Sequence, residues 1–193
     1  MPNKVIALDI GNVCLHIHPE RCLALLKDCN CASIPPELLR YEADELERGR
    51  VSDADFLVKV REMTGTRASD KTLTDAFLAI LGEPVEGMPE LVAELPQLGF
   101  QAVFFSDTSA IHLAAVRRIF PSARFVPQGV YSFEVGERKP HPAMFEAFEY
   151  RFGTPVCYFD DRADLIEAAR RHGWNAHQFH SAAEMKKILS AGC

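Results

Sequence analysis

Several short stretches of the sequence place polar, reactive side chains directly after apolar runs. Asp9 follows V-I-A-L, Ser106-Asp107 follows Q-A-V-F-F, and Asp160-Asp161 follows P-V-C-Y-F, while Lys139 lies in G-E-R-K-P-H-P. Any one of these acids could simply cap a helix. If the apolar runs are neighbouring parallel strands, however, all of these groups gather at the carboxyl edge of one sheet, where ligands bind.

Such a gathering suits phosphoryl transfer. Asp9 could attack phosphorus and form an aspartyl-phosphate. A carboxylate and a phosphate dianion repel each other, so the reaction needs Mg²⁺, held by Asp9, the carbonyl of Gly11 and the Asp160-Asp161 pair. Lys139 would neutralise a phosphoryl oxygen as a point charge. The Ser106 hydroxyl and nearby backbone N–H groups would bind the other oxygens.

The elements that must position these groups follow from hydrophobic periodicity. Residues 4–8 are typical of a buried strand, and after Gly87 strands and helices alternate. This alternation predicts an α/β fold, a doubly wound parallel Rossmann-like sheet with helices on both faces. Residues 19–82 predict about four short helices with no strand between them. We therefore expect a core formed by 1–14 and 86–193 and a small inserted helical cap over 15–85.

Composition excludes several classes of partner. The net charge of −6 leaves no basic face for nucleic acid or for a membrane surface. No apolar run approaches the ~18 residues that a membrane span needs. The N-terminus begins a strand at once and shows no secretory leader. We therefore expect a cytoplasmic protein whose six cysteines are reduced thiols and whose partner is a small phosphorylated metabolite.

The four stretches together resemble the haloacid dehalogenase (HAD) superfamily of phosphatases. A-L-D-I-G-N-V is similar to its first motif, which begins with the nucleophile, and V-F-F-S-D-T-S to its second, which binds phosphate. G-E-R-K-P-H-P-A-M-F is similar to its third motif and C-Y-F-D-D-R-A-D-L to its acidic, magnesium-binding fourth. The helical segment lies where this superfamily inserts its small cap. The D-x-G-N-V opening resembles a subgroup related to bacterial glucose-1-phosphate phosphatases, so a sugar phosphate is one expected substrate.

The resemblance also implies roles for individual residues. Asp161 aligns with the direct metal ligand, and Asp160 would bind the ion through water. Asp107 would contribute its backbone N–H and cap a helix, and Asn12 would place its amide near the phosphate. Asp164 corresponds to a polar group that orients a ligand or the lysine, although an acid at a helix N-terminus would look the same.

Gly11 departs from the family pattern. The superfamily commonly has a second Asp there, which protonates the leaving group, and a positioned proton donor contributes ~10²–10⁴-fold to rate. Its loss favours substrates with good leaving groups, such as sugar anomeric, acyl or aryl phosphates. Alternatively, His16 or His18 supplies the proton, because histidine titrates near neutrality.

Two other functions stay open at this point. A 2-haloacid dehalogenase uses the same aspartate to attack carbon and also lacks the second acid, but it needs no metal and gives the Asp160-Asp161 pair no purpose. A catalytically weak member that only binds a phosphorylated ligand is supported by Gly11 alone.

Overall fold

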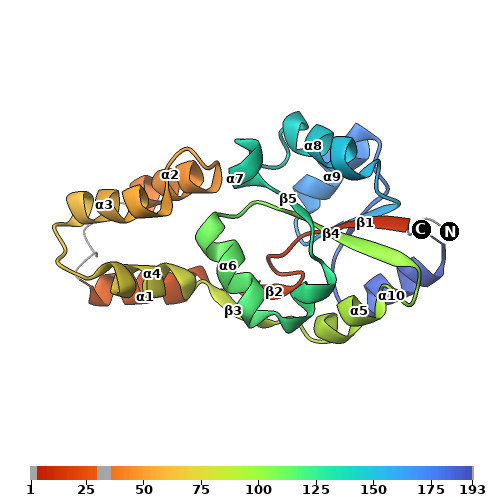
Figure 1. Cartoon of the computed structure of the whole chain (residues 1–193), viewed down its shortest axis with the longest axis horizontal. Coiled ribbons are helices and arrows are strands. Elements are labelled where there is room, and N and C mark those ends of the chain that lie inside the picture. The colour runs from red at the N-terminus through yellow and green to blue at the C-terminus, as the bar shows by residue number, and fades with distance from the viewer. Residues whose placement is uncertain (1–3, 30–35, 193) are drawn as a thin grey trace.

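The computed structural model of the chain describes residues 4–29 and 36–192. Its centre is a five-stranded sheet of order β5-β4-β1-β6-β7, in which every neighbouring pair is parallel (Figure 1). The strands are β1 (Lys4–Leu8), β4 (Phe100–Ser106), β5 (Gly129–Tyr131), β6 (Cys157–Asp160) and β7 (Ala176–Gln178). The predicted α/β fold with a parallel sheet is confirmed.

Helices cover both faces of this sheet. Alternation along β1 sends Ile6 and Leu8 into one hydrophobic core and Ala7 into the other. The first core is covered by α5 (Met88–Glu94), α6 (Ala110–Ile119), the 3₁₀ helix η1 (Pro121–Phe125) and α10 (Ala182–Ser190). The second is covered by α8 (Pro142–Phe152) and α9 (Ala163–His172), and the short helix α7 (Ser132–Val135) precedes α8.

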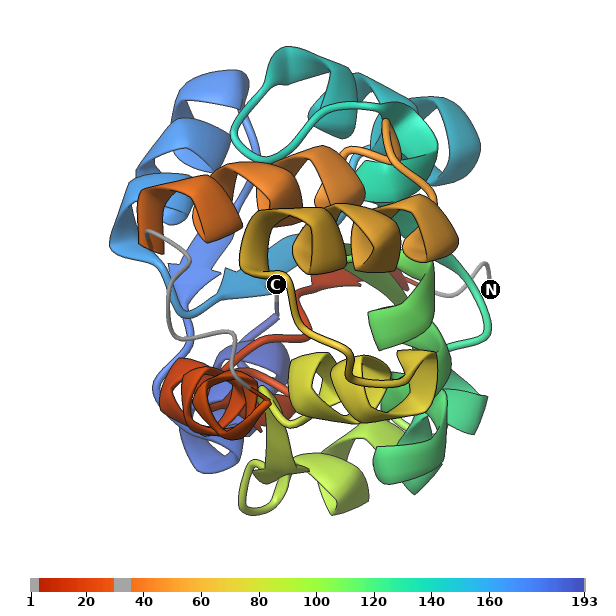
Figure 2. The same ribbon diagram turned by 90° about the vertical axis from the view of Figure 1, so that its left-hand side faces the viewer.

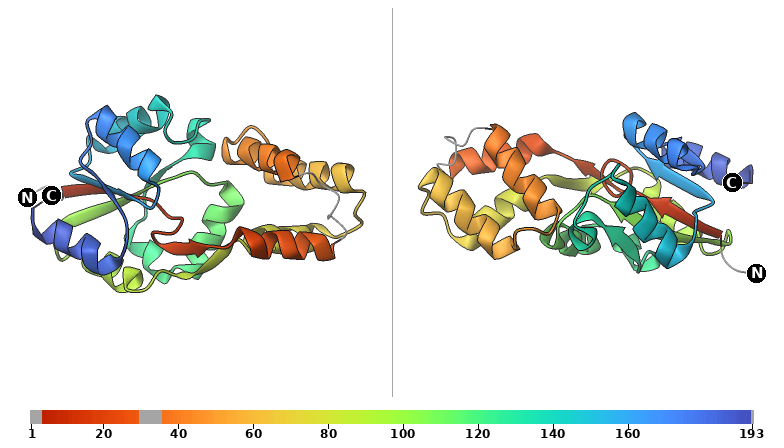
Figure 3. Two further views of the ribbon diagram at one scale, coloured as in Figure 1. Left: turned by 180° about the vertical axis from the view of Figure 1, so that it is seen from behind. Right: turned by 90° about the horizontal axis from the view of Figure 1, so that it is seen from above.

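The remaining helices form a separate layer with its own core. They are α1 (Pro19–Asp28), α2 (Pro36–Glu47), α3 (Asp53–Thr64) and α4 (Asp70–Leu78). Helix α1 packs beside α4 and α2 beside α3 (Figure 2). Their buried side chains, such as Leu26, Phe56 and Leu73, form a cluster distinct from the two cores of the sheet. The layer lies beyond the carboxyl end of β1, as the views from behind and above show (Figure 3).

The helical layer joins the sheet through two short strands that the sequence did not predict. β2 (Leu15–Ile17) and β3 (Leu81–Pro84) pair antiparallel. The expectation that the segment holds no strand is therefore wrong at β3, whose L-G-E-P is too short and too polar to show a strand pattern. β5 was missed for the same reason, since G-V-Y offers three residues.

Capping residues mark the ends of several helices. Ser52 caps α3, where its Oγ accepts a hydrogen bond from the backbone N–H of Asp55 at 3.1 Å. Gly65 ends the same helix in the left-handed conformation. Ser109 caps α6 by accepting from the N–H of His112. These caps satisfy backbone groups that would otherwise lack partners at the helix ends.

The cysteines only partly match the expectation of reduced thiols. Cys14 and Cys22 are free thiols, but Cys157 is disulfide-bonded, so the expectation is wrong at that position. Cys31 and Cys193 lie outside the described residues. Over the described ranges 4–29 and 36–192, none of the helices has the length and apolar character to cross a bilayer.

Two glycines give a matched test of how α2 packs against the rest of the molecule. Gly49 and Gly65 have nearly equal φ, +65° and +66°, but a Cβ on Gly49 would lie 2.1 Å from the backbone oxygen of Phe133, whereas one on Gly65 meets nothing within 4 Å. Gly65→Ala should cost about 1 kcal/mol, for the left-handed conformation alone. Gly49→Ala should cost at least about 2 kcal/mol more, because the backbone at Phe133 must move. Urea unfolding measures both, and equal losses would show that this contact does not restrain the helical layer.

Candidate active site

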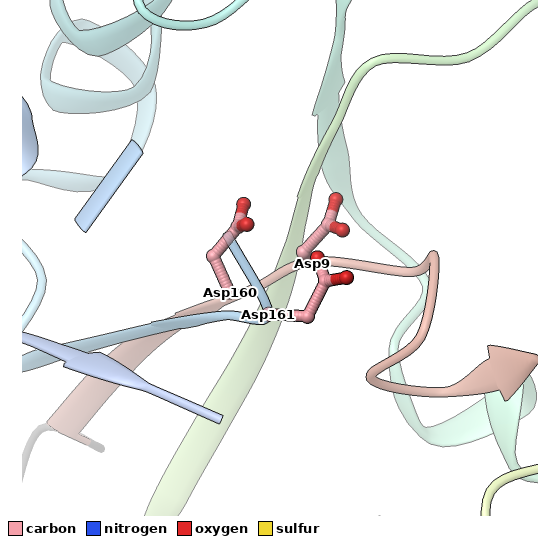
Figure 4. A group of neighbouring side chains, drawn as sticks. All are labelled: Asp9, Asp160 and Asp161. Carbon is pink, nitrogen blue, oxygen red and sulfur yellow. The ribbon is translucent and has the colours of Figure 1, made fainter. Parts of the chain in front are cut away.

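The carboxyl ends of three strands bring the predicted groups together. Asp9 follows β1, Ser106 ends β4 and Asp160 ends β6, and all three are buried. Asp9, Asp160 and Asp161 lie side by side (Figure 4), and each offers a carboxylate oxygen within 4.8 Å of the others. The convergence expected of parallel strand ends is therefore present.

Lys139 reaches the same point from the segment between β5 and α8. Its Nζ donates to Asp9 Oδ1 at 2.9 Å, to Asp160 Oδ2 at 2.6 Å and to the carbonyl of Phe105 at 3.0 Å. An ammonium has three protons, so these acceptors satisfy it. The lysine side chain is almost fully buried, and this fixes its charge beside the two carboxylates.

Tyr158 is a member of the cluster that the sequence analysis missed. Its hydroxyl donates to Asp160 Oδ2 and lies 3.3 Å from Lys139 Nζ. The backbone N–H of Arg162 donates to the other oxygen of Asp160 at 2.9 Å. Period-two alternation could have found Tyr158, because residues two apart on a strand share a face.

Burial and mutual charge set the protonation of the cluster. Burial raises the pKa of Asp9 to about 7, a rise that Lys139 opposes and Asp160 increases. Burial also favours a neutral Lys139. The neighbouring carboxylates, of which Asp9 contributes most, nevertheless raise the pKa of Lys139 well above the usual value. At Asp160 burial acts to raise the pKa, but Lys139, the Tyr158 hydroxyl and the N–H of Arg162 together lower the pKa of that carboxyl below its usual value. The stable state of the cluster is thus a lysine cation paired most firmly with Asp160.

Asp107 does not cap a helix, since that position belongs to Ser109. Its Oδ1 instead accepts the backbone N–H of Lys139 at 2.9 Å, and its Oδ2 lies 3.4 Å from Nε of Arg138. This carboxylate therefore positions the segment that carries the lysine. The predicted cap was wrong because α6 starts two residues later than Asp107 would require.

Arg138 links the same segment to helix α2. Its guanidinium donates to Asp44 at 2.7 Å and lies 3.2 Å from Glu47. Glu137 adds to the link through Arg48 and Arg50, at the end of α2. The loop that supplies Lys139 is thereby held to the helical layer by ion pairs that no sequence pattern indicated.

Asn12 supports the acidic cluster from the side. Its Nδ2 donates to Asp161 Oδ2 at 3.0 Å, and its Oδ1 accepts the N–H of Ile17 at 3.1 Å. The residue has a left-handed backbone, φ 51°, which asparagine tolerates well. Asn12 thus orients Asp161 and holds the end of β2, and its predicted phosphate contact stays a prediction.

A cavity of about 150 Å³ adjoins these groups. Glu47 and His112 line it, and the sequence analysis predicted neither. The full lining is Asp9, Ile10, Gly11, Ile17, Glu47, Ile80, Leu81, Ser106, Asp107, Thr108, His112 and Val116. A reacting phosphate would lie here, beside Asp9 and Ser106.

Of the predicted residues, Asp9, Gly11, Ser106 and Asp107 line this cavity, whereas Lys139, Asp160, Asp161 and Asn12 lie behind Asp9 and do not line it, and His16, His18 and Asp164 lie elsewhere. His16 and His18 flank Ile17 on β2, so strand alternation turns them away from it. His18 instead lies 3.1 Å from Glu20 and 3.6 Å from Glu83. Asp164 is exposed in the first turn of α9, where Arg162 binds both of its oxygens. That pairing favours the interpretation that Asp164 is an acidic residue at a helix N-terminus, without a role in orienting a ligand or Lys139.

The donor set fits magnesium. Asp9, Asp160 and Asp161 offer hard oxygen atoms close together, as this ion prefers. Protein donors already engage both oxygens of Asp160, whereas Asn12 alone is bonded to Asp161. Asp161 and Asp9 are therefore the better direct ligands, and Gly11 lies with Asp9 on the wall of the cavity.

This sheet, with its buried aspartate, lysine and paired acids at one edge, defines a hydrolase class. The haloacid dehalogenase-like hydrolase family matches residues 4–173, so the chain belongs to that family and is a hydrolase. The matched span runs from the first strand to the end of α9 and contains every group of the cluster. No curated protein matches the sequence closely enough to serve as a relative.

Solved structures share the fold. A HAD family enzyme from Bacteroides thetaiotaomicron is 23% identical with a TM-score of 0.83, covering 94% of this chain and 95% of its own. A structure of that enzyme with magnesium and inorganic phosphate has a TM-score of 0.81, with 23% identity and coverage of 93% and 95%. A HAD-like family hydrolase from Porphyromonas gingivalis is 20% identical with a TM-score of 0.83 and covers 98% of both chains. These likenesses establish the fold.

The raised pKa of Asp9 gives a prediction about stability in metal-free protein. A carboxyl whose pKa rises from about 3.9 when unfolded to about 7 when folded binds protons more tightly in the folded state. Its ionisation therefore lowers the free energy of unfolding progressively as the pH rises towards 7. Asp9→Asn removes that penalty.

Raising the pH from 5.5 to 8 should therefore destabilise wild type relative to Asp9→Asn. The gap between their free energies of unfolding should change by on the order of 2 kcal/mol in favour of the variant. Urea titrations in EDTA at both pH values measure it. Asp164→Asn is the control, since that carboxylate is exposed and should give a pH-independent difference. A constant difference for Asp9→Asn would contradict the burial argument.

Proposed function

We propose that the protein is a Mg²⁺-dependent phosphatase that hydrolyses a small phosphorylated metabolite through an aspartyl-phosphate on Asp9. The main support is the position of Lys139 between the buried carboxylates of Asp9 and Asp160. This cluster adjoins a cavity that Asp9 and Ser106 line. A sugar phosphate, as in the subgroup that the D-x-G-N-V opening resembles, is one candidate substrate. The relative from B. thetaiotaomicron that was solved with magnesium and phosphate is consistent with this chemistry.

In the first step a carboxylate oxygen of Asp9 attacks phosphorus, and the bond from phosphorus to the leaving-group oxygen breaks. Lys139 holds the other oxygen of Asp9 and fixes the direction of attack. Ser106 and the backbone N–H groups after β4 bind phosphoryl oxygens. In the second step water attacks the phosphorus, releases inorganic phosphate and regenerates the carboxylate. Magnesium, held by Asp9, Asp161 and the Gly11 carbonyl, would offset the repulsion between substrate and carboxylates.

The helical layer would act as a cap over this site. Residues 15–85 supply Ile17, Glu47, Ile80 and Leu81 to the cavity, while the core supplies the reacting groups. We propose that this segment sets which leaving group fits, and that 1–14 and 86–193 carry the chemistry.

The covalent mechanism predicts complete dependence on Asp9. Wild type should release phosphate from a good substrate such as phenyl phosphate only with Mg²⁺. Asp9→Asn should lose more than about 10³-fold in kcat, because an amide cannot attack, while a thermal melt shows that it stays folded. Asp164→Asn, which removes an equal charge outside the cavity, should stay within a few-fold of wild type.

The same assay separates the rival functions. Turnover that survives in Asp9→Asn would remove the covalent mechanism. Chloride release from 2-chloropropionate that EDTA leaves unchanged would indicate a dehalogenase. Tight phosphate binding without turnover would indicate a binding protein.

Gly11 predicts a steep dependence on the leaving group. Without a proton donor at that position, kcat/KM should fall steadily as the pKa of the leaving group rises. An acid can be restored by Gly11→Asp, combined with Ile17→Ala because a Cβ at Gly11 would lie 3.2 Å from Cγ1 of Ile17, an atom that alanine lacks. This double variant should flatten the dependence and raise kcat for alkyl phosphates by up to about 10²-fold.

Gly11→Asn in the same Ile17→Ala background is the matched control, because it has nearly the same shape but cannot act as the acid. If wild type already shows a flat dependence, the argument fails. Another group would then protonate the leaving group, and the cavity residues Glu47 and His112 would be replaced first.

A further inference from the structure

We propose that the substrate is an aryl phosphate monoester whose aromatic leaving group lies in an apolar chamber of the helical layer. This inference rests on the proposed function, since it requires that Asp9 take the phosphoryl group. It goes further by choosing one leaving-group class among the sugar, acyl and aryl phosphates that Gly11 alone leaves open.

The chamber is a second cavity, of about 280 Å³, that continues from the first. The two share Glu47, Ile80 and His112 as lining residues, so a molecule bound at Asp9 can extend from one into the other. The volume is close to the lower limit of ~300–1,000 Å³ that is usual for ligand pockets. The chamber therefore lies where the leaving group of a bound phosphate ester must go.

Its walls come from helices α1, α2 and α4 and are mainly apolar. Pro19, Cys22 and Leu23 contribute from the first helix, Leu39 and Ala43 from the second, and Phe77 from the fourth. On the side of the first cavity, Ile10, Ile17 and Val116 continue the apolar surface. Apolar walls of this kind stabilise a bound ring by about 25 cal/mol per Å² of apolar surface removed from water.

The polar groups at the junction are already engaged by the protein. Glu47 lies 3.2 Å from the guanidinium of Arg138. His112 Nε2 lies 3.3 Å from the carbonyl of Phe77, which can only accept, so this nitrogen carries the proton. His112 Nδ1 then accepts from the hydroxyl of Ser109 at 2.9 Å. His112 can therefore hydrogen-bond to a sugar only by giving up these partners, while Glu47 has one carboxylate oxygen, Oε1, beyond the one paired with Arg138.

This scarcity of polar partners favours an aryl group over a sugar. A sugar has several hydroxyls, and each one that leaves water for an apolar wall without finding a partner costs about 1–3 kcal/mol. Among the described residues, the other charged side chain that lines the chamber is Arg40, which is exposed on α2. An aromatic ring needs no such partners.

Gly11 points to the same class by an independent argument. Phenols ionise at a pKa of about 10, as the tyrosine side chain does, far below aliphatic alcohols. When the bond from phosphorus to oxygen breaks, a phenolate can therefore leave with its electron pair and take a proton from water afterwards. The missing acid and the apolar chamber thus favour one substrate class for separate reasons.

A matched pair of leucines tests the chamber. Leu23 and Leu25 both lie on α1 and are 52% and 42% exposed, but only Leu23 lines the chamber. Residues two apart on a helix face different directions. Asparagine at either position should be tolerated in folding, because both side chains already contact water.

The wild-type enzyme with Mg²⁺ should be assayed on 2-naphthyl phosphate, phenyl phosphate, glucose 1-phosphate and acetyl phosphate. We expect kcat/KM for 2-naphthyl phosphate to exceed that for phenyl phosphate by about tenfold, mostly through KM, because the second ring fills the chamber. Glucose 1-phosphate should fall at least about tenfold below phenyl phosphate. Leu23→Asn should lower the ratio of 2-naphthyl phosphate to acetyl phosphate activity by about fivefold, and Leu25→Asn should leave this ratio unchanged.

Binding to Asp9→Asn gives a readout that does not depend on turnover. Calorimetry on this variant should show 2-naphthyl phosphate binding at least about tenfold more tightly than inorganic phosphate, and Leu23→Asn in the same background should reduce the advantage. Two results would overturn the aryl assignment while the phosphatase proposal stands. One is a preference for glucose 1-phosphate, and the other is equal activity on both aryl esters together with no effect of Leu23→Asn. Selective aryl binding without any turnover would overturn the phosphatase proposal instead.

Discussion

The site depends on one buried ammonium group between two carboxylates. Removing Lys139 would leave Asp9 and Asp160 unpaired in a place with little water, and an unpaired buried charge is strongly destabilising. Tyr158 and the N–H of Arg162 add hydrogen bonds that such a pair needs. With Asp161 alongside, the ionised cluster still carries more negative than positive charge, so it is suited to attract a cation beside the proposed phosphate site.

The same loop connects this cluster to the helical layer. The backbone of Lys139 is held by Asp107, while its neighbour Arg138 pairs with Asp44 and Glu47 on α2. A movement of α2 would therefore disturb the segment that carries the lysine. Since Glu47 also lines the cavity, the position of the helical layer, the shape of the leaving-group site and the orientation of Lys139 are physically linked.

Much of the core of the site could be predicted from the sequence, for a simple geometric reason. Asp9, Ser106 and Asp160 each end an apolar strand, and parallel strands must bring such ends together. Glu47 and His112 could not be predicted, because they reach the cavity only through the docking of α2 and α6, which leaves no local pattern. The strands β2 and β3 are too short to show alternation. Asp107 was misassigned because a carboxylate after a strand gives the same sequence pattern whether it caps a helix or holds a loop.

Gly11 connects the chemistry of the site to its selectivity. An aspartate there would add a further carboxylate beside a cluster that already has one ammonium for three acids. Its side chain would also collide with Ile17, whose Cγ1 lies 3.2 Å from where a Cβ would stand. Because glycine has no side chain, Ile17 can form part of the apolar wall next to Asp9. The loss of a proton donor and the gain of an apolar surface are thus consequences of one residue. The proposed phosphatase would therefore rely on its substrate for a leaving group that is stable as an anion and binds favourably to apolar surroundings.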